Sequence, residues 1–212
     1  MDPLDTAHRM TAADARSIVV VPANEVSWAD LQVVFGDRGV PHGCQCQWFK
    51  FPGAEFGAMD GPDRRGRFAE QTACGDPTAS STSGLVASVD GEPAGWCAVE
   101  PRTAYPRLRT SRLVWAGRDE DRDDASVWAV TCFVTRKGYR RQGISTALAH
   151  AAVAFARDRG ATAVEGYPLL PRADGRVASA DLFVGTVGMF ESAGFIEVSR
   201  PTERRAVMRI AT

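Results

Sequence analysis

The sequence has no hydrophobic run long enough to cross a bilayer. Its longest weakly polar stretch with helical spacing, residues 147–156, is about half the length that a membrane-spanning helix needs. The chain also begins with acidic residues, Asp2 and Asp5, whereas a secretory signal peptide has a basic start followed by an apolar core. We therefore expect a cytoplasmic protein with no membrane partner.

An excess of charge of one sign is also missing. The 25 Lys and Arg nearly balance the 26 Asp and Glu, which leaves a formal net charge of -1 over 212 residues. Such a balance gives no overall attraction for nucleic acid or for an anionic membrane. Because 44% of the residues are hydrophobic, a disordered or fibrous chain is excluded as well.

Paired cysteines with metal-ligand spacing are absent. The five cysteines are odd in number, which favours reduced thiols. His42, Cys44 and Cys46 lie close together, but no C-x-x-C or H-x-x-x-H pair accompanies them, so we predict no metal site. The neighbouring aromatic residues Trp48 and Phe49 suggest a wall of an acceptor pocket or, alternatively, part of the core.

No internal repeat or low-complexity linker divides the chain. Residues 1–16 have little apolar pattern and are expected to form a loose leader, followed by one α+β domain over residues 17–212. Helical apolar spacing and capping residues predict helices over about 28–36, 62–73, 144–160 and 184–192. Short apolar or β-branched runs predict strands over 18–22, 85–89, 94–99, 127–135, 162–167, 195–198 and 206–210.

A basic turn stands between the strand predicted at 127–135 and the helix that follows it. Four of the residues 136–141 are Arg or Lys, and they precede a helix N-terminus, where unpaired N–H groups and the helix dipole attract anions. Gly143 lets a ligand approach the backbone, and Ser145 and Thr146 add hydroxyl groups. We interpret this turn as a phosphate or pyrophosphate site; the alternative is an ordinary turn with solvated arginines. The nucleotide patterns G-x-x-x-x-G-K-[ST] and G-x-G-x-x-G are both absent.

The same turn carries a family resemblance. Arg140-Arg141-Gln142-Gly143-Ile144-Ser145 resembles the Q/R-x-x-G-x-G/A acyl-CoA motif of the GCN5-related N-acetyltransferase (GNAT) superfamily. Residues 189–195, a short helix ending in Gly-Phe before a strand, are similar to the second signature of that family. With the order of elements, the resemblance extends over residues 17–210, and the block at 44–48 is similar to that of an uncharacterised actinobacterial-type branch.

The resemblance implies a GNAT fold, with a mixed sheet of about 6–7 strands and about 4 helices. That sheet would splay apart between strands 127–135 and 162–167 to admit the pantetheine arm of acetyl-CoA as co-substrate. The implied activity is transfer of an acetyl group to a primary amine of a small molecule, by direct attack in a ternary complex, with a strand amide polarising the carbonyl. The implied cofactor-binding residues are Cys132, Phe133, Val134, Arg140, Arg141, Gln142, Gly143, Ile144, Ser145 and Thr146.

One departure from the family affects catalysis. Phe190 stands where many relatives carry a tyrosine that protonates the departing thiolate. Tyr167, at the end of strand 162–167, is a candidate replacement acid, and Glu165, on the same strand face, is a candidate general base. The alternatives are a tyrosine that only ends a strand and a glutamate that pairs with an arginine.

Other readings of the resemblance stay open. The acyl donor could be another carrier, such as an aminoacyl-tRNA, or the chain could be a non-catalytic acyl-CoA-binding module. The acceptor could be an antibiotic-like amine, an amino acid, a polyamine or a protein N-terminus. The acidic run at 119–124 could attract a cationic amine or be a solvated loop. A homodimer would be unsurprising for this family.

Overall fold

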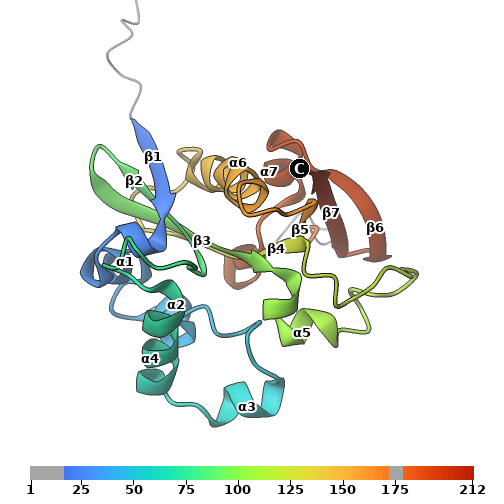
Figure 1. Ribbon diagram of the computed structural model, residues 1–212, viewed down its shortest axis with the longest axis horizontal. Coiled ribbons are helices and arrows are strands. Elements are labelled where there is room, and N and C mark those ends of the chain that lie inside the picture. Colours follow the sequence, from blue (N-terminus) through green and yellow to red (C-terminus); the bar gives the residue numbers. More distant parts are fainter. Residues whose placement is uncertain (1–16, 172–178) are drawn as a thin grey trace, which may run out of the picture.

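The computed structural model describes residues 17–171 and 179–212, whose helices lie on both faces of a sheet (Figure 1). The leader expected at residues 1–16 lies outside the described residues. Nothing in the described part of the chain is a helix both long and apolar enough to cross a membrane.

The sheet contains seven strands among the described residues, in the order β1-β2-β3-β4-β5-β7-β6. Only β4 and β5 run parallel; the other described pairs are antiparallel, so the sheet is mixed, as expected. Every strand that the sequence predicts is present. Their bounds are β1 (Ile18–Pro22), β2 (Gly84–Val89), β3 (Glu92–Pro101), β4 (Val127–Thr135), β5 (Ala163–Gly166), β6 (Ile196–Thr202) and β7 (Arg205–Ala211).

The four predicted helices correspond to α1 (Trp28–Phe35), α4 (Gly61–Thr72), α6 (Ile144–Arg157) and α7 (Val187–Ser192). Short helices lie in segments expected as loops, because a helix of one or two turns is too short to show an apolar period. These are α2 (Gly39–Cys44), α3 (Gly53–Ala58), α5 (Pro106–Arg109) and the 3-10 segments η1 (Ala23–Glu25), η2 (Arg102–Ala104) and η3 (Ser179–Val184).

Side-chain caps fix where several of these helices begin. The Ser27 hydroxyl accepts the backbone N–H of Asp30 at 3.0 Å, and donates to the Asp30 carboxylate at 2.7 Å, which confirms the capping pair before α1. Asp60 accepts the N–H of Asp63 at the start of α4. Such caps satisfy N–H groups that have no partner within the helix.

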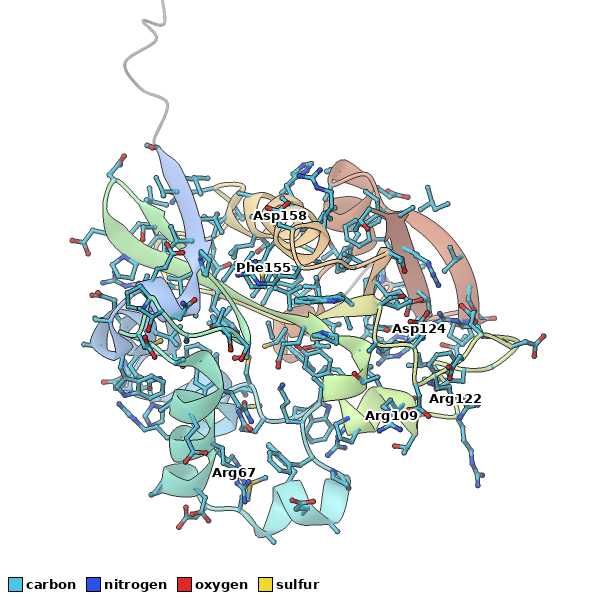
Figure 2. The ribbon with its side chains drawn as sticks, viewed as in Figure 1. Arg67, Arg109, Arg122, Asp124, Phe155 and Asp158 are labelled. Carbon is cyan, nitrogen blue, oxygen red and sulfur yellow. The ribbon has the colours of Figure 1, made fainter. Side chains whose placement is uncertain are left out.

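The two faces of the sheet are covered by different helices. α6 and α7 cover one face and α1 to α5 the other (Figure 1). The alternation of β2 produces this division, because Leu85 and Ala87 pack in the α6 core while Val86 packs with α1 and α4. Phe155 lies between α6 and the sheet (Figure 2), 5.9 Å from Trp128 of β4.

A β-bulge and a splayed strand pair mark the centre of the sheet. Opposite β3, Cys132 pairs with Ala98 and Val130 with Val99, so Thr131 is an extra residue in β4. On the other side, the β4–β5 ladder ends at Val130 and Gly166. The sheet therefore opens between β4 and β5, as the GNAT resemblance implies.

Candidate active site

A large cavity lies where β4 leaves β5. Its volume is about 910 Å³, and it extends from β4 to two separate segments, one with α2 and α3 and the other with α5. Cys132, Phe133 and Val134, the residues expected to pair with pantetheine, all line it. Among the described strands, none pairs with β4 beyond Val130 on this side, so the strand edge next to the cavity is not used by the sheet.

The bulge at Thr131 decides how these three residues are arranged. It shifts the alternation so that Phe133 packs toward α7, with its ring 5.9 Å from that of Phe190. Cys132 and Val134 instead belong to the core on the α1 face. Both faces of this short piece of strand are thus held by side-chain packing, which keeps its main chain at the cavity wall.

The basic turn before α6 has an unusual backbone. Gly138, Arg141 and Gly143 all have positive φ, at 98°, 61° and 78°. Gly143 is also the N-cap of α6 and supplies no side chain to its first N–H groups. These N–H groups therefore remain available to an anion, which is the property that the sequence interpretation requires.

The remaining predicted cofactor residues divide into surface and anchoring groups. Arg140 and Arg141 are exposed beside the turn. The Gln142 side chain donates to the Gly138 carbonyl at 2.9 Å, and Ser145 lies 3.2 Å from the Thr135 hydroxyl, so both brace the turn.

The two remaining predicted cofactor-binding residues, Ile144 and Thr146, differ in which of their atoms a ligand could reach. The Ile144 side chain is buried in the α6 core, so only its main chain can serve a ligand. Thr146 is half-buried on the first turn of α6, where its hydroxyl lies among the groups expected to meet an anion.

Glu165 lies at the centre of a buried ionic cluster. Its carboxylate accepts hydrogen bonds from Arg102 at 3.2 Å, from Arg209 at 3.2 Å and from Arg118. The Tyr167 hydroxyl donates to the same carboxylate at 2.7 Å. The Glu165 and Arg102 side chains are fully buried. Pairing with arginine, the alternative left open for Glu165, is therefore present.

The Tyr167 hydroxyl is also held inside this cluster. Burial, with the neighbouring Glu165 charge, raises the pKa of the Tyr167 phenol well above its usual value. Its hydroxyl is committed to Glu165, and neither residue lines the cavity. This geometry favours a role for both in holding β5 in place, and their catalytic roles stay predictions.

The cavity wall is mostly apolar and contains three arginines. Aromatic and aliphatic side chains form most of the wall, and Arg64, Arg107 and Arg205 are its charged residues. Trp48 and Phe49 line it, consistent with an acceptor wall. Burial, and then the neighbouring Cys46, raises the pKa of the lining thiol Cys44 to about 11, so this thiol is protonated at neutral pH.

The acidic run at 119–124 does not line the cavity. Arg109 forms an ion pair with Asp123, and Arg118 pairs with Glu120 at 2.8 Å. Figure 2 shows Arg109, Arg122 and Asp124 gathered beside α5 and the loop that enters β4. The interpretation as a solvated loop is thus incomplete, because part of the run pairs with arginines.

The His42 ring contacts the main chain. The His42 Nδ1 atom lies 2.8 Å from the Gly36 carbonyl oxygen. In the part of the chain that the structure describes, no three His, Cys, Asp or Glu side chains are arranged to hold a metal ion.

Part of this site lies in a region that the chain shares with a known protein family. The profile of the acetyltransferase (GNAT) family matches residues 47–167, more than half of the chain. This chain belongs to the GNAT acetyltransferase family. The match includes β4, the basic turn, α6 and β5, and it makes the chain an N-acetyltransferase.

Solved structures show the same fold. A GCN5-related N-acetyltransferase from Kribbella flavida has 16% identity and a TM-score of 0.51, with 95% of this chain and 100% of that chain covered. A GNAT family acetyltransferase from Bacillus anthracis has 9% identity and a TM-score of 0.50, with 93% and 96% covered. At such low identities the likeness concerns the fold alone. No curated protein matches this chain.

Within this GNAT acetyltransferase, Phe190 fills the space where a family tyrosine is expected. Its ring is completely buried and packs 5.0 Å from the Phe195 ring. A methyl group on Gly166 would overlap the Phe190 ring, so the two residues are in close contact where β5 leaves β4. Phe190 has no hydroxyl to give and packs as a core residue.

Sequence reasoning missed Arg107, an arginine that lines the cavity of this acetyltransferase. Arg107 lies on α5, within a segment expected as a loop, and its guanidinium is stacked 3.9 Å from the Trp48 ring centre. Its only sequence signal was membership in the Pro- and Arg-rich stretch 101–112. Trp48 is far from it in sequence, so no local pattern could join the two.

Proposed function

We propose that this GNAT family member transfers an acetyl group from acetyl-CoA to the primary amine of a small molecule. The observation that carries the proposal is the opening between β4 and β5, where residues 132–134 line a cavity of about 910 Å³. A cavity of this size accommodates the end of an acyl carrier together with a small acceptor.

The turn before α6 fits the anionic part of such a carrier. We assign the pyrophosphate to the main-chain N–H groups from Arg141 to Ser145, with Arg140 and Arg141 supplying positive charge. Apart from Gly143 and its two chain neighbours, no described residue has an atom within 4 Å of the position where a Gly143 side chain would begin, so a phosphate has space there. Thr146 adds a hydroxyl on the same turn of the helix.

The reaction that this arrangement supports is direct aminolysis of a thioester. The acceptor amine, in its neutral form, attacks the carbonyl carbon, and a main-chain N–H of residues 132–134 polarises the carbonyl oxygen. As the carbon–sulfur bond breaks, CoA leaves as a thiolate, and the new amide nitrogen loses its proton. Acyl transfer of this kind depends strongly on how the two reactants are positioned.

No general acid is identified among the described residues of the cavity wall. Phe190 cannot protonate the thiolate, and Glu165 and Tyr167 are bonded to each other and to arginines. A thiolate is a far better leaving group than an alkoxide, because a thiol is a much stronger acid than an alcohol. We therefore expect water to protonate the thiolate after it has left, with positioning as the main contribution of the protein.

Calorimetric titration with acetyl-CoA tests the cofactor site. We expect micromolar binding by the wild-type protein, weakened at least about 30-fold by Arg141→Glu combined with Gly143→Asp, because the two changes place negative charge at the helix N-terminus, worth about 2 kcal/mol. Gly143→Asn is the matched control, since asparagine also tolerates positive φ but adds no charge. Circular dichroism checks that each variant is folded.

Absence of acetyl-CoA binding by the folded wild-type protein would contradict the proposal. Turnover then separates an enzyme from a binding module. Steady release of CoA thiol with an amine supports catalysis, and binding without release across a broad panel of amines supports the non-catalytic alternative.

A further inference from the structure

The Arg107 guanidinium in the cavity has an unused terminal hydrogen-bonding group. The Arg107 Nη2 atom is buried, and it makes no hydrogen bond to any described atom. Its Nε atom donates to the Phe51 carbonyl at 3.2 Å, and the guanidinium carbon lies 3.9 Å from the centre of the Trp48 ring. Buried charged groups are normally paired, so this donor indicates an anionic partner that binds in the cavity.

The other cavity arginines are used by the protein itself. Arg64 donates to the carbonyl oxygens of Gly43, Phe56 and Met59, which ties α4 to α2 and α3. Arg205 donates to the Tyr167 carbonyl at 3.4 Å. The Arg64 Nε atom also lacks a protein acceptor, but both Nη atoms of Arg64 donate to carbonyl oxygens. Arg107 differs in that its Nη2 atom, at the end of the side chain, is buried and donates to no described atom.

The rest of the cavity determines what accompanies the anion. No Asp or Glu is among the described residues that line it, so a polycationic acceptor would meet three arginines and no counter-charge. The wall instead offers large apolar surfaces from Trp48, Phe49, Leu113, Val114 and Phe183. An acceptor with an apolar body gains the most from this wall.

We propose that the acceptor is a small primary amine that carries both a carboxylate and a large apolar body, as an aromatic or branched-chain amino acid does. The carboxylate pairs with Arg107, the apolar body lies against the Trp48 wall, and the amine faces the acyl group at residues 132–134. Guanidinium and carboxylate form strong, directional hydrogen bonds, which suits a specificity contact. This inference rests on the proposed acetyl transfer for the role of the amine.

Matched acceptor pairs provide the test. Initial rates of CoA release are measured with acetyl-CoA and either L-tryptophan or tryptamine, either L-phenylalanine or phenethylamine, and with spermidine. The paired compounds differ only by the carboxylate. We expect kcat/KM to be at least about tenfold higher for each amino acid than for its amine, since a charged hydrogen bond contributes that much.

The variants locate the effect. Arg107→Gln should reduce the amino-acid rates by about 10- to 100-fold and the amine rates by much less, so the preference is lost. Arg107→Lys should keep part of the preference, because it retains the charge but not the planar fork. Arg112→Gln is the matched control, an exposed arginine in the same segment that does not line the cavity. Thermal unfolding checks the folding of each variant.

Direct binding keeps this inference separate from the proposed function. L-tryptophan is titrated into the protein in the presence of CoA, with wild-type and Arg107→Gln compared. Arg107-dependent binding without any turnover would overturn acetyl transfer but support the anion contact. Turnover with tryptamine or spermidine equal to that with amino acids would overturn this inference and leave acetyl transfer intact. A higher rate with octanoyl-CoA, with no effect of the acceptor carboxylate, would also overturn it, because the apolar space would then belong to the acyl chain.

Discussion

At the scale of single residues, the Glu165 cluster connects distant parts of the chain. Its carboxylate is bonded to Arg102 from η2, Arg118 from the loop before β4, and Arg209 from β7. Arg102 and Arg118 also lie against Trp115, each 4.7 Å from its ring centre. The cluster therefore attaches the segment between β3 and β4 to the sheet face beside the cavity.

Replacing Glu165 by Gln should mainly reduce stability. The change keeps the shape of the side chain but leaves buried guanidinium groups without their counter-charge, at a cost of about 3–5 kcal/mol. For a chain of this length we expect the unfolding midpoint to fall by about 6–20 °C, measured by calorimetry or circular dichroism.

Activity at a temperature where both proteins are folded distinguishes the two roles of Glu165. A positioning residue should leave the pH profile of kcat/KM unchanged. A loss of the acidic limb of that profile, with an unfolding midpoint within about 2 °C of wild type, would instead identify Glu165 as the general base. Tyr167→Phe is the companion variant, since it removes one donor to the carboxylate and keeps the ring.

At the scale of elements, the site depends on two strands that begin as partners and then separate. The extra residue Thr131 reverses the alternation of β4, and Gly166 ends β5 where the Phe190 ring of α7 packs against it. A larger residue at 166 would push α7 away. The glycine and the phenylalanine together set the spacing between β5 and α7.

Restoring the family tyrosine with Phe190→Tyr should therefore not restore an acid. The end of the buried ring lies against Gly166, so a hydroxyl there is crowded. We expect a loss of about 2–4 kcal/mol in the free energy of unfolding, by urea denaturation, and no gain in kcat.

A comparison variant is Gly166→Ala, which crowds the same contact from the strand side and should be destabilising as well. A rise in kcat for Phe190→Tyr with unchanged stability would contradict this view, because it would show that the hydroxyl reaches the reacting sulfur.

At the scale of the whole molecule, one sheet joins the described chain from end to end. Asp90 of the β2–β3 turn accepts the Ser17 N–H at 3.2 Å at one margin of the sheet. β7 pairs with β5 through residues as late as Ala211. Because β4 pairs with β3 on one side and with β5 on the other, the sheet is continuous across both halves of the chain, and we propose that residues 17–212 fold as a unit.

A protein comprising residues 17–212 tests whether these residues fold as one unit. It should unfold in one cooperative transition, with its midpoint within about 2 °C of the full chain and acetyl-CoA binding unchanged, as measured by calorimetry. Two separate transitions, or a marked loss of stability, would show that the domain boundary is misplaced.

Local sequence pattern determined much of this fold. The apolar run 127–135, the glycine turn and the periodic helix after it predict the β4–turn–α6 unit, because strand and helix periods and positive φ at glycine are short-range properties. The family motif at residues 140–145 lies in this unit. That is why the sequence could predict a cofactor site in this unit, and the assignment of its residues stays a prediction.

Tertiary structure alone decided which residues line the cavity and which partners Glu165 has. Arg102 is 63 residues from Glu165, and Arg107 is 56 residues from the Phe51 carbonyl that holds it. Helix and strand periods carry no information over such separations, since these contacts form only when the segment between β3 and β4 packs under the sheet. The sequence could therefore name Glu165 as a polar residue on an apolar strand, but the folding of distant arginines around it determined what its charge does.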